Sequence, residues 1–320
     1  MTTMDTVPVR LLFFSVVFKF IAMIIGVLGN LTVLIYTVFL NKEKTATSYL
    51  MGNLALADLL MCVTFYPIWI VEFIQTILNI DGDQDLFCAL SRPTIWAAMF
   101  ASVATLLAIT IDRYLYIEKP LKYIFLVTRR RVSLVIIGIW SITLLAMIVL
   151  QNPYKKDKRI RRSYCDISND TFLLMNIFIV YIPLTLIFLL NLRILMIART
   201  QRKRVAADTT KASFTFGEQS NKRQLLSIYH FIRALKAVKT FAIVVVVLAF
   251  CVLTPTVVGL AIEFSCSYSC RMIWYVVIHY EFIGINSIVN AFIYGMRHMK
   301  YRKAYGNILF RIMRCNRSGN

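Results

Sequence analysis

Long apolar blocks separated by short polar segments dominate the sequence. Seven blocks can be marked, each carried past its strictly apolar run to the expected helical ends: residues 11–40, 49–78, 87–117, 132–150, 172–197, 228–264 and 272–296. About 20 apolar residues are enough for a helix to cross the hydrocarbon core of a bilayer. The short alternating segments of a transmembrane β-barrel are not found in these blocks. The pattern therefore predicts an all-α membrane protein built on a bundle of seven transmembrane helices.

The bundle is expected to fill most of the chain, with a short segment on either side of it. Residues 1–10 form an extracellular N-terminal segment, residues 11–296 the transmembrane domain, and residues 297–320 a basic amphipathic helix with a short cytoplasmic tail. The first block is too long for a removable signal peptide and lacks a small-residue cleavage site, so we expect it to stay as an anchor. Prolines inside the blocks are tolerated in membrane helices, because neighbouring groups satisfy the freed carbonyls.

The charged residues give this bundle an orientation. Only 16% of the 320 residues are charged, and 36 Lys and Arg against 16 Asp and Glu give a net charge of +20, which alone would suggest a nucleic-acid binder. With the C-terminus in the cytoplasm, 26 basic and five acidic residues fall on the cytoplasmic side, which leaves +21 inside, zero outside and −1 in the membrane. The positive-inside rule and anionic inner-leaflet lipid explain this distribution. We therefore expect a multi-pass plasma-membrane protein with an extracellular N-terminus, lipid contacts and no nucleic-acid partner.

Four cysteines fall on the extracellular, oxidising side and predict two disulfides. Cys88 begins the third block, Cys165 lies between the fourth and the fifth, and Cys266 and Cys270 precede the seventh. We favour the pairs Cys88–Cys165 and Cys266–Cys270. Two free thiols are the alternative for the second pair, because its three intervening residues permit closure only in a suitable turn.

One carboxylate, Asp58 in the run NLALADLL, lies deep in the second block and is the single charge expected to be buried in the membrane. An ionisable group at that depth is costly and therefore marks a functional site by default. Polar residues at matching depth are Asn30, Ser102, Asn286 and Asn290. Such an oxygen-rich cluster can hold a small cation such as sodium, or a water network. A purely structural polar contact between helices is the alternative.

A second charged motif, IDRYLYI, ends the third block at its cytoplasmic side. Asp112 can hold Arg113 as an ion pair, and the arginine can swing away to bind backbone carbonyls of a partner or tyrosines of the chain itself. The positive-inside rule alone would also place an arginine here, so the motif gains its weight from its position. No nucleophile with its base, metal-spaced histidine set or phosphate-binding loop accompanies it in the sequence, so we do not expect an enzyme.

Taken in order, these motifs resemble the rhodopsin-like (class A) G-protein-coupled receptors across all seven blocks. The resemblance rests on GNLTVL, NLALADLL, Cys88 followed by SVATLLAITIDRYLYIEKPLKY, the single residues Trp140, Pro183 and Pro255, and NSIVNAFIY with Asn290 and Tyr294. Residues 297–313 are similar to the eighth helix of the family, with Cys315 placed for palmitoylation. Local resemblances extend to melatonin receptors, which share Ala291 after Asn290, and to adenosine receptors around the IDRY motif.

The resemblance implies a ligand-gated switch that performs no covalent chemistry itself. An extracellular small molecule or peptide favours one packing of the helices, the sixth helix swings outward about Pro255, and Arg113 meets the Gα subunit of a heterotrimeric G protein. The residues implied at this coupling site are Asp112, Arg113, Tyr114, Asn191 and Tyr294, and those of the activation hinge are Pro183, Leu253, Pro255 and Asn290. The sodium pocket of the family corresponds to Asp58, Ser102, Asn286 and Asn290, and no other cofactor is implied.

Several positions depart from the family pattern. Leu253 stands where the sixth helix usually has a tryptophan, Asn191 where a tyrosine usually meets the motif arginine, and Leu235 where an acid often locks that arginine. Ala291 replaces the usual proline after Asn290. Together these departures predict weak restraint of the inactive state and measurable signalling without a ligand.

The sequence narrows the choice of ligand only by disfavouring known ligand classes. Ile95 occupies the place at which amine receptors have an aspartate, so a protonated amine is disfavoured, and the seventh block lacks the lysine that opsins need for retinal. Leu260 and Gly284 replace the Asn and His with which adenosine receptors hold their nucleoside. Family geometry gives a candidate ligand pocket made of Glu72, Ile95, Trp96, Met99, Glu263, Tyr280 and Glu281.

Arrestin is a further expected partner, and two rival functions stay open. Arrestin binding is expected to use hydroxyls between the fifth and sixth blocks, at Thr209, Thr210, Ser213 and Ser220. A receptor-fold protein without G-protein output is one alternative, because of the departures just described. A seven-span transporter is the less favoured one, since it would require an internal repeat or discontinuous helices.

Overall fold

The computed structural model describes the backbone of residues 7–42, 44–80, 82–151, 174, 176–212, 218–297, 302 and 306. Cys165, Cys315 and most of the predicted eighth helix lie outside these residues, so the statements about them stay predictions. The same holds for the side chains of residues 201–239, which include Thr209, Thr210, Ser220 and Leu235.

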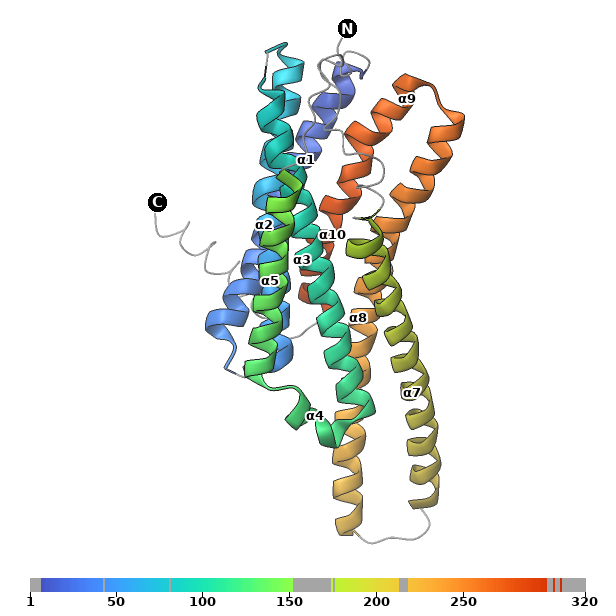
Figure 1. Cartoon of the computed structure of the whole chain (residues 1–320). Helices are drawn as coiled ribbons and strands as arrows, with labels where there is room; N and C mark the ends of the chain where they lie inside the picture. The colour runs from blue at the N-terminus through green and yellow to red at the C-terminus, as the bar shows by residue number, and fades with distance from the viewer. Residues whose placement is uncertain are drawn as a thin grey trace, which may run out of the picture.

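Every apolar block predicted from the sequence forms a helix, and the helices pack into an elongated bundle (Figure 1). The elements in chain order are α1 (Val9–Ile35) with η2 (Tyr36–Leu40), α2 (Ala46–Ile77), α3 (Gln84–Glu118), α4 (Pro120–Leu126), α5 (Arg129–Gln151), η3 (Asn176–Tyr181), α7 (Ile182–Ala212), α8 (Glu218–Ser265), α9 (Tyr268–Ile273), η4 (Trp274–His279) and α10 (Tyr280–Arg297). The η elements are short stretches of π-helix that continue a neighbouring α-helix. The start of α1 and helix α9 lie at one end of the bundle, and α4 lies at the other (Figure 1).

Six helices in the described part of the chain are long and apolar enough to cross a membrane. The seventh predicted block is also helical, but it is divided among α9, η4 and α10. Large apolar side chains such as Phe14, Leu145 and Val246 are exposed on the outside of the bundle, as expected of surfaces that face lipid tails. The prediction of an all-α seven-helix membrane bundle is therefore confirmed.

The short helix α4 was not predicted from the sequence. It follows directly after α3 and begins at Pro120, whose fixed φ and missing N–H suit the first position of a helix. None of its residues is buried. Its apolar residues were too few to form a membrane block, so the hydropathy pattern gave no sign of it.

Buried apolar side chains form two main clusters along the bundle. The larger one joins α3, α7, α8 and α10 through residues such as Leu106, Ile187, Leu248 and Tyr294. The second joins α1, α2 and η4 through residues such as Leu12, Phe65, Trp69 and Val277. These two clusters fix the helices between which the polar residues of the candidate sites lie.

Candidate functional site

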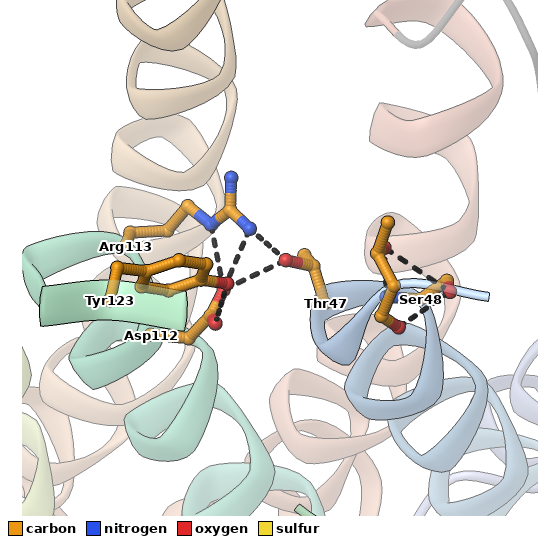
Figure 2. Close-up of polar contacts among 6 residues, drawn as sticks. Thr47, Ser48, Asp112, Arg113 and Tyr123 are labelled. Atoms are coloured by element: carbon orange, nitrogen blue, oxygen red, sulfur yellow. Dashed lines mark hydrogen bonds and ion pairs between the residues drawn. The ribbon is translucent and has the colours of Figure 1, made fainter. Parts of the chain in front are cut away.

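The predicted pair Asp112 and Arg113 lies in a compact polar network at the α4 end of the bundle (Figure 2). The Asp112 carboxylate accepts hydrogen bonds from Thr47 Oγ1 at 2.8 Å and from Tyr123 Oη at 2.7 Å. Arg113 donates to the same carboxylate through Nε at 3.0 Å and Nη2 at 2.7 Å, and Nη2 also donates to Thr47. The Asp112 side chain is 3% exposed, so these donors stabilise a charge that is largely removed from water.

Three separate elements position this network. Thr47 lies in the first turn of α2, two residues after the N-cap residue Thr45, whose hydroxyl accepts from Ser48 N at 3.2 Å. Tyr123 comes from α4, so the unpredicted helix supplies one of the donors. Partial burial raises the pKa of the Tyr123 phenol, and the nearby Asp112 carboxylate raises that pKa further. The phenol therefore stays protonated at neutral pH and keeps donating to Asp112.

The other predicted coupling residues lie apart from this network in the contacts that the structure resolves. Tyr114 packs on a small apolar cluster that joins Ile117 and Ile194. Asn191 is buried and donates from Nδ2 to the carbonyl of Ile187, four residues earlier in α7, at 2.8 Å. Tyr294 is 1% exposed and belongs to the larger apolar cluster. The Asn191 amide thus donates to a carbonyl of its own helix, and this hydrogen bond satisfies the polar group inside the bundle.

The polar residues from which the sequence predicts an ion site lie close together around Asp58. Its carboxylate is 1% exposed and accepts hydrogen bonds from Ser102 Oγ at 3.1 Å and from Asn290 Nδ2 at 2.9 Å, and Ser287 adds a further hydroxyl donor. The side-chain oxygens of Asn286 and Asn290 are buried and accept no hydrogen bond from the residues that the structure describes. Asn286, Ser287 and Ser102 also line a small pocket beside the carboxylate.

Asn30, another expected partner of Asp58, has a different role in the contacts seen. Its Nδ2 donates to the carbonyls of Gly26 and Ser287, both at 3.0 Å. The bond to Ser287 ties α1 to α10 at a residue whose hydroxyl also contacts Asp58. A separate polar chain runs from Trp140 Nε1 to Asn53 at 2.8 Å and from Asn53 to Thr105 at 2.8 Å, joining α5, α2 and α3.

The residues predicted for the activation hinge are only partly turned inward. Pro255 is buried within α8, and Pro183 lies half-buried just after η3. Leu253 is 45% exposed, whereas its neighbour Val252 is buried and lines the pocket beside Asp58. The position at which the family resemblance implies a tryptophan is therefore partly exposed in this structure.

The candidate ligand pocket divides between the two apolar clusters. Trp96 and Met99 belong to the larger cluster, and Ile95 and Tyr280 belong to the second one. Glu72 and Glu281 are both buried, whereas the side chain of Glu263 lies outside the described part of the chain. The sequence placed all seven residues in one pocket, but the structure brings together mainly those of the second cluster, around Tyr280 and Glu281.

The expectation that Asp58 is the single buried charge is wrong. Lys19 of α1 is 1% exposed and forms an ion pair with Glu281 of α10. Glu72 is buried as well. Lys19 lies eight residues past the start of the first apolar block, and a lysine inside such a run is itself a signal that could have marked the site. Its partner is 262 residues away, so the local pattern could not have shown the pairing.

The cysteines agree with the sequence prediction as far as the structure describes them. Cys266 and Cys270 are paired, with their Cα atoms 5.7 Å apart. Cys88 is disulfide-bonded, and its predicted partner Cys165 lies outside the described residues. Cys62 and Cys251 are buried free thiols within helices, as expected of small apolar residues.

Comparisons with known proteins agree with this arrangement. A family model described as "7 transmembrane receptor (rhodopsin family)" matches residues 29–294. The alpha-1A adrenergic receptor of Mus musculus is 27% identical over 89% of this chain and 65% of its own length. The melatonin receptor type 1C of Xenopus laevis is 25% identical over 91% of this chain and 66% of its own length. The chain thus spans about two thirds of the length of these relatives. Because the family match runs from the first helix to the last, the chain belongs to the rhodopsin family of seven-transmembrane receptors.

Proposed function

We propose that the chain is a cell-surface G-protein-coupled receptor, which binds an extracellular ligand and activates heterotrimeric G proteins, in part without any ligand. The observation that carries this proposal is the network around Asp112 and Arg113. It holds a cationic side chain at the α4 end of the bundle through hydrogen bonds that join α2, α3 and α4. Release of Arg113 from Asp112 would present a guanidinium group to a cytoplasmic partner. The relatives are named for different ligands, so neither ligand is carried over to this chain.

Helix α4 offers a surface on which such a partner could rest. Leu121, Ile124 and Phe125 are 87%, 74% and 77% exposed, which is unusual for large apolar side chains outside a lipid-facing helix. Tyr123 of the same helix reaches back to Asp112. We therefore place the Gα contact on the outer face of α4, from which binding would disturb the Asp112 network directly.

Nucleotide exchange with purified Gα subunits of each class tests this function. We expect the receptor to accelerate exchange without ligand, and we expect Arg113→Ala to reduce that exchange at least tenfold. Arg129→Ala is the matched control, because Arg129 is an exposed arginine at the start of α5, and it should keep most of the activity. If no Gα class responds above the Arg113→Ala level, the chain is a receptor-fold protein without G-protein output.

A sodium ion beside Asp58 is the second part of the proposal. The Asp58 carboxylate, the hydroxyls of Ser102 and Ser287, and the amide oxygens of Asn286 and Asn290 are the kind of hard oxygen ligands that such a cation prefers. The single carboxylate matches a single positive charge. Bound sodium would hold α2, α3 and α10 together and so favour the packing seen here.

Sodium binding should appear as a cation-specific gain in thermal stability. We expect the melting temperature of the purified receptor to be about 3 °C higher in NaCl than in choline chloride, the shift for an ion present at about ten times its dissociation constant. Asp58→Asn should abolish this difference. Asp112→Asn, which removes another buried carboxylate, should preserve it. An equal NaCl effect in the Asp58→Asn variant would rule out the ion site.

Arrestin and lipid belong to the proposal as further partners. Arrestin would bind the phosphorylated hydroxyls of Thr209, Thr210, Ser213 and Ser220, between the fifth and sixth apolar blocks. The basic cytoplasmic residues would meet anionic lipid, with the N-terminus on the extracellular side.

A further inference from the structure

A buried ion pair joins α1 to α10 and is enclosed by one face of α2. Lys19 and Glu281 form the pair, and the Lys19 side chain is only 1% exposed. Tyr66, Trp69 and Phe73 recur at the spacing of one helical face of α2, and all three are buried. We call these five residues the α1–α2–α10 cluster.

The charges of the α1–α2–α10 cluster already balance each other. Lys19 Nζ lies 4.5 Å from the centroid of the Phe73 ring and 5.9 Å from that of Trp69, within the range of cation–π attraction. Glu281 supplies the opposite charge. A ligand group with a full charge of either sign would therefore lack a counter-ion here, and its desolvation would go uncompensated.

Three polar atoms of the cluster remain without a hydrogen-bond partner among the described residues. They are the Tyr66 hydroxyl, the Trp69 indole Nε1 and the Glu281 Oε2 atom. Buried polar atoms are satisfied in the large majority of cases, so three such atoms in one cluster call for an explanation. Their chemistry is complementary, because Trp69 Nε1 can only donate, Glu281 Oε2 can only accept and the Tyr66 hydroxyl can do both.

Packing brings these atoms to the same place. A Cβ atom added at Gly284, one turn after Glu281 in α10, would lie 2.5 Å from the Tyr66 hydroxyl oxygen, so that hydroxyl abuts α10 close to Glu281. The Trp69 ring packs on Tyr280, the residue before Glu281, with 5.0 Å between ring centroids. The Lys19 ammonium is close both to the Trp69 ring and to Glu281. The two side chains that carry the unpaired donors, Tyr66 and Trp69, thus both contact the stretch of α10 that carries Glu281.

We propose that the α1–α2–α10 cluster is a binding subsite for an uncharged ligand group that both donates and accepts hydrogen bonds, of which a carboxamide is the simplest. Its carbonyl oxygen would accept from Trp69 Nε1 and the Tyr66 hydroxyl, and its N–H would donate to Glu281 Oε2. The aromatic rings of Trp69 and Tyr280 would cover an adjoining apolar or aromatic part of the ligand. This inference rests on the proposed function, because it describes how the extracellular ligand is recognised.

Three probes that share an indole ring test the subsite. N-acetyl-L-tryptophanamide carries the uncharged carboxamide, N-acetyl-L-tryptophan carries a carboxylate in its place, and tryptamine carries an ammonium group. We expect the amide at millimolar concentration to raise the melting temperature of the purified full chain by about 3 °C. The two charged probes should raise it by less than a third of that shift. No stabilisation by the amide, or equal stabilisation by all three probes, would overturn the proposal.

The Tyr66→Phe variant separates a ligand contact from a structural one. It removes an unpaired buried hydroxyl and keeps the ring, so the melting temperature without probe should stay the same or rise. The shift with the amide should fall to less than half. Tyr181→Phe is the matched control, because the Tyr181 hydroxyl pairs with Thr256 Oγ1 at 3.0 Å, and it should keep the full amide shift.

The opposite result for Tyr66→Phe would also be decisive. A lower melting temperature without probe, combined with an unchanged amide shift, would mean that the hydroxyl serves the fold alone, and the subsite would be wrong. The binding measurement needs no G protein, so it can fail while ligand-free nucleotide exchange succeeds. It can equally succeed in a chain that activates no Gα subunit.

Discussion

Replacing Lys19 by methionine is expected to lower the stability of the folded receptor by about 3–5 kcal/mol, the usual cost of leaving one partner of a buried ion pair alone. The substitution leaves Glu281 with a buried charge and no cation, and it also removes the contact of the ammonium group with the Phe73 ring. We expect a clear fall in the melting temperature of the purified receptor and a lower yield at the cell surface. Both follow from the same uncompensated carboxylate.

The double substitution Lys19→Met with Glu281→Met should restore most of this loss. Two apolar side chains of similar length need no counter-ion, and such replacements of whole buried pairs are often neutral or stabilising. Arg10→Met is the matched control for loss of a basic residue from α1, because Arg10 is exposed, and its effect should stay within about 0.5 kcal/mol. If the double variant were as unstable as Lys19→Met alone, the two residues would not act as a pair.

The second large effect is expected at the α4 end of the bundle. Asp112→Asn should raise ligand-free nucleotide exchange about tenfold, because a shift of about 1.4 kcal/mol in favour of the released arginine changes its population by that factor. The carboxylate accepts from Thr47, Tyr123 and Arg113, and an amide cannot match its charge-assisted hydrogen bonds. The measurement is the rate of GTPγS binding to the responsive Gα subunit.

Tyr123→Phe should have a smaller effect in the same direction, since it removes one of these donors and leaves the charge of Asp112. Tyr116→Phe is the control, because the Tyr116 ring packs edge-on against Tyr123 with 5.1 Å between centroids, and phenylalanine keeps that contact. An exchange rate that falls in the Asp112→Asn variant would show that the network favours signalling rather than restraining it.

These two predictions differ in how much of their basis could be read from the sequence. The helices were predictable from the lengths of the apolar blocks. The group of polar residues around Asp58 was predictable because its members lie at matching depths in those blocks. Asp112 and Arg113 were predictable as a pair, but their partners were not. Tyr123 reaches Asp112 only because Pro120 starts a helix that turns the chain back under α3.

Other features depend on helix rotation and on contacts between distant parts of the chain. The outward position of Leu253 and the bond of Asn191 to its own helix are set by how α8 and α7 are rotated in the bundle. Periodicity over a uniformly apolar block does not determine that rotation, since nearly every position is compatible with lipid. The Lys19–Glu281 pair depends on α1 meeting α10, which only the closed bundle reveals.

The attachment of α1 to α10 at two heights has a mechanical consequence. Lys19 binds Glu281, and Asn30 binds the backbone of Ser287, so the attachments are separated by about 16 Å along α1. Two helices joined at two points cannot slide or rotate freely against each other, so α1 and α10 should move as one rigid unit. The outer face of this unit meets the lipid tails. Any reorientation of α10 must therefore displace lipid, and the thickness and lateral pressure of the bilayer enter the energy of switching.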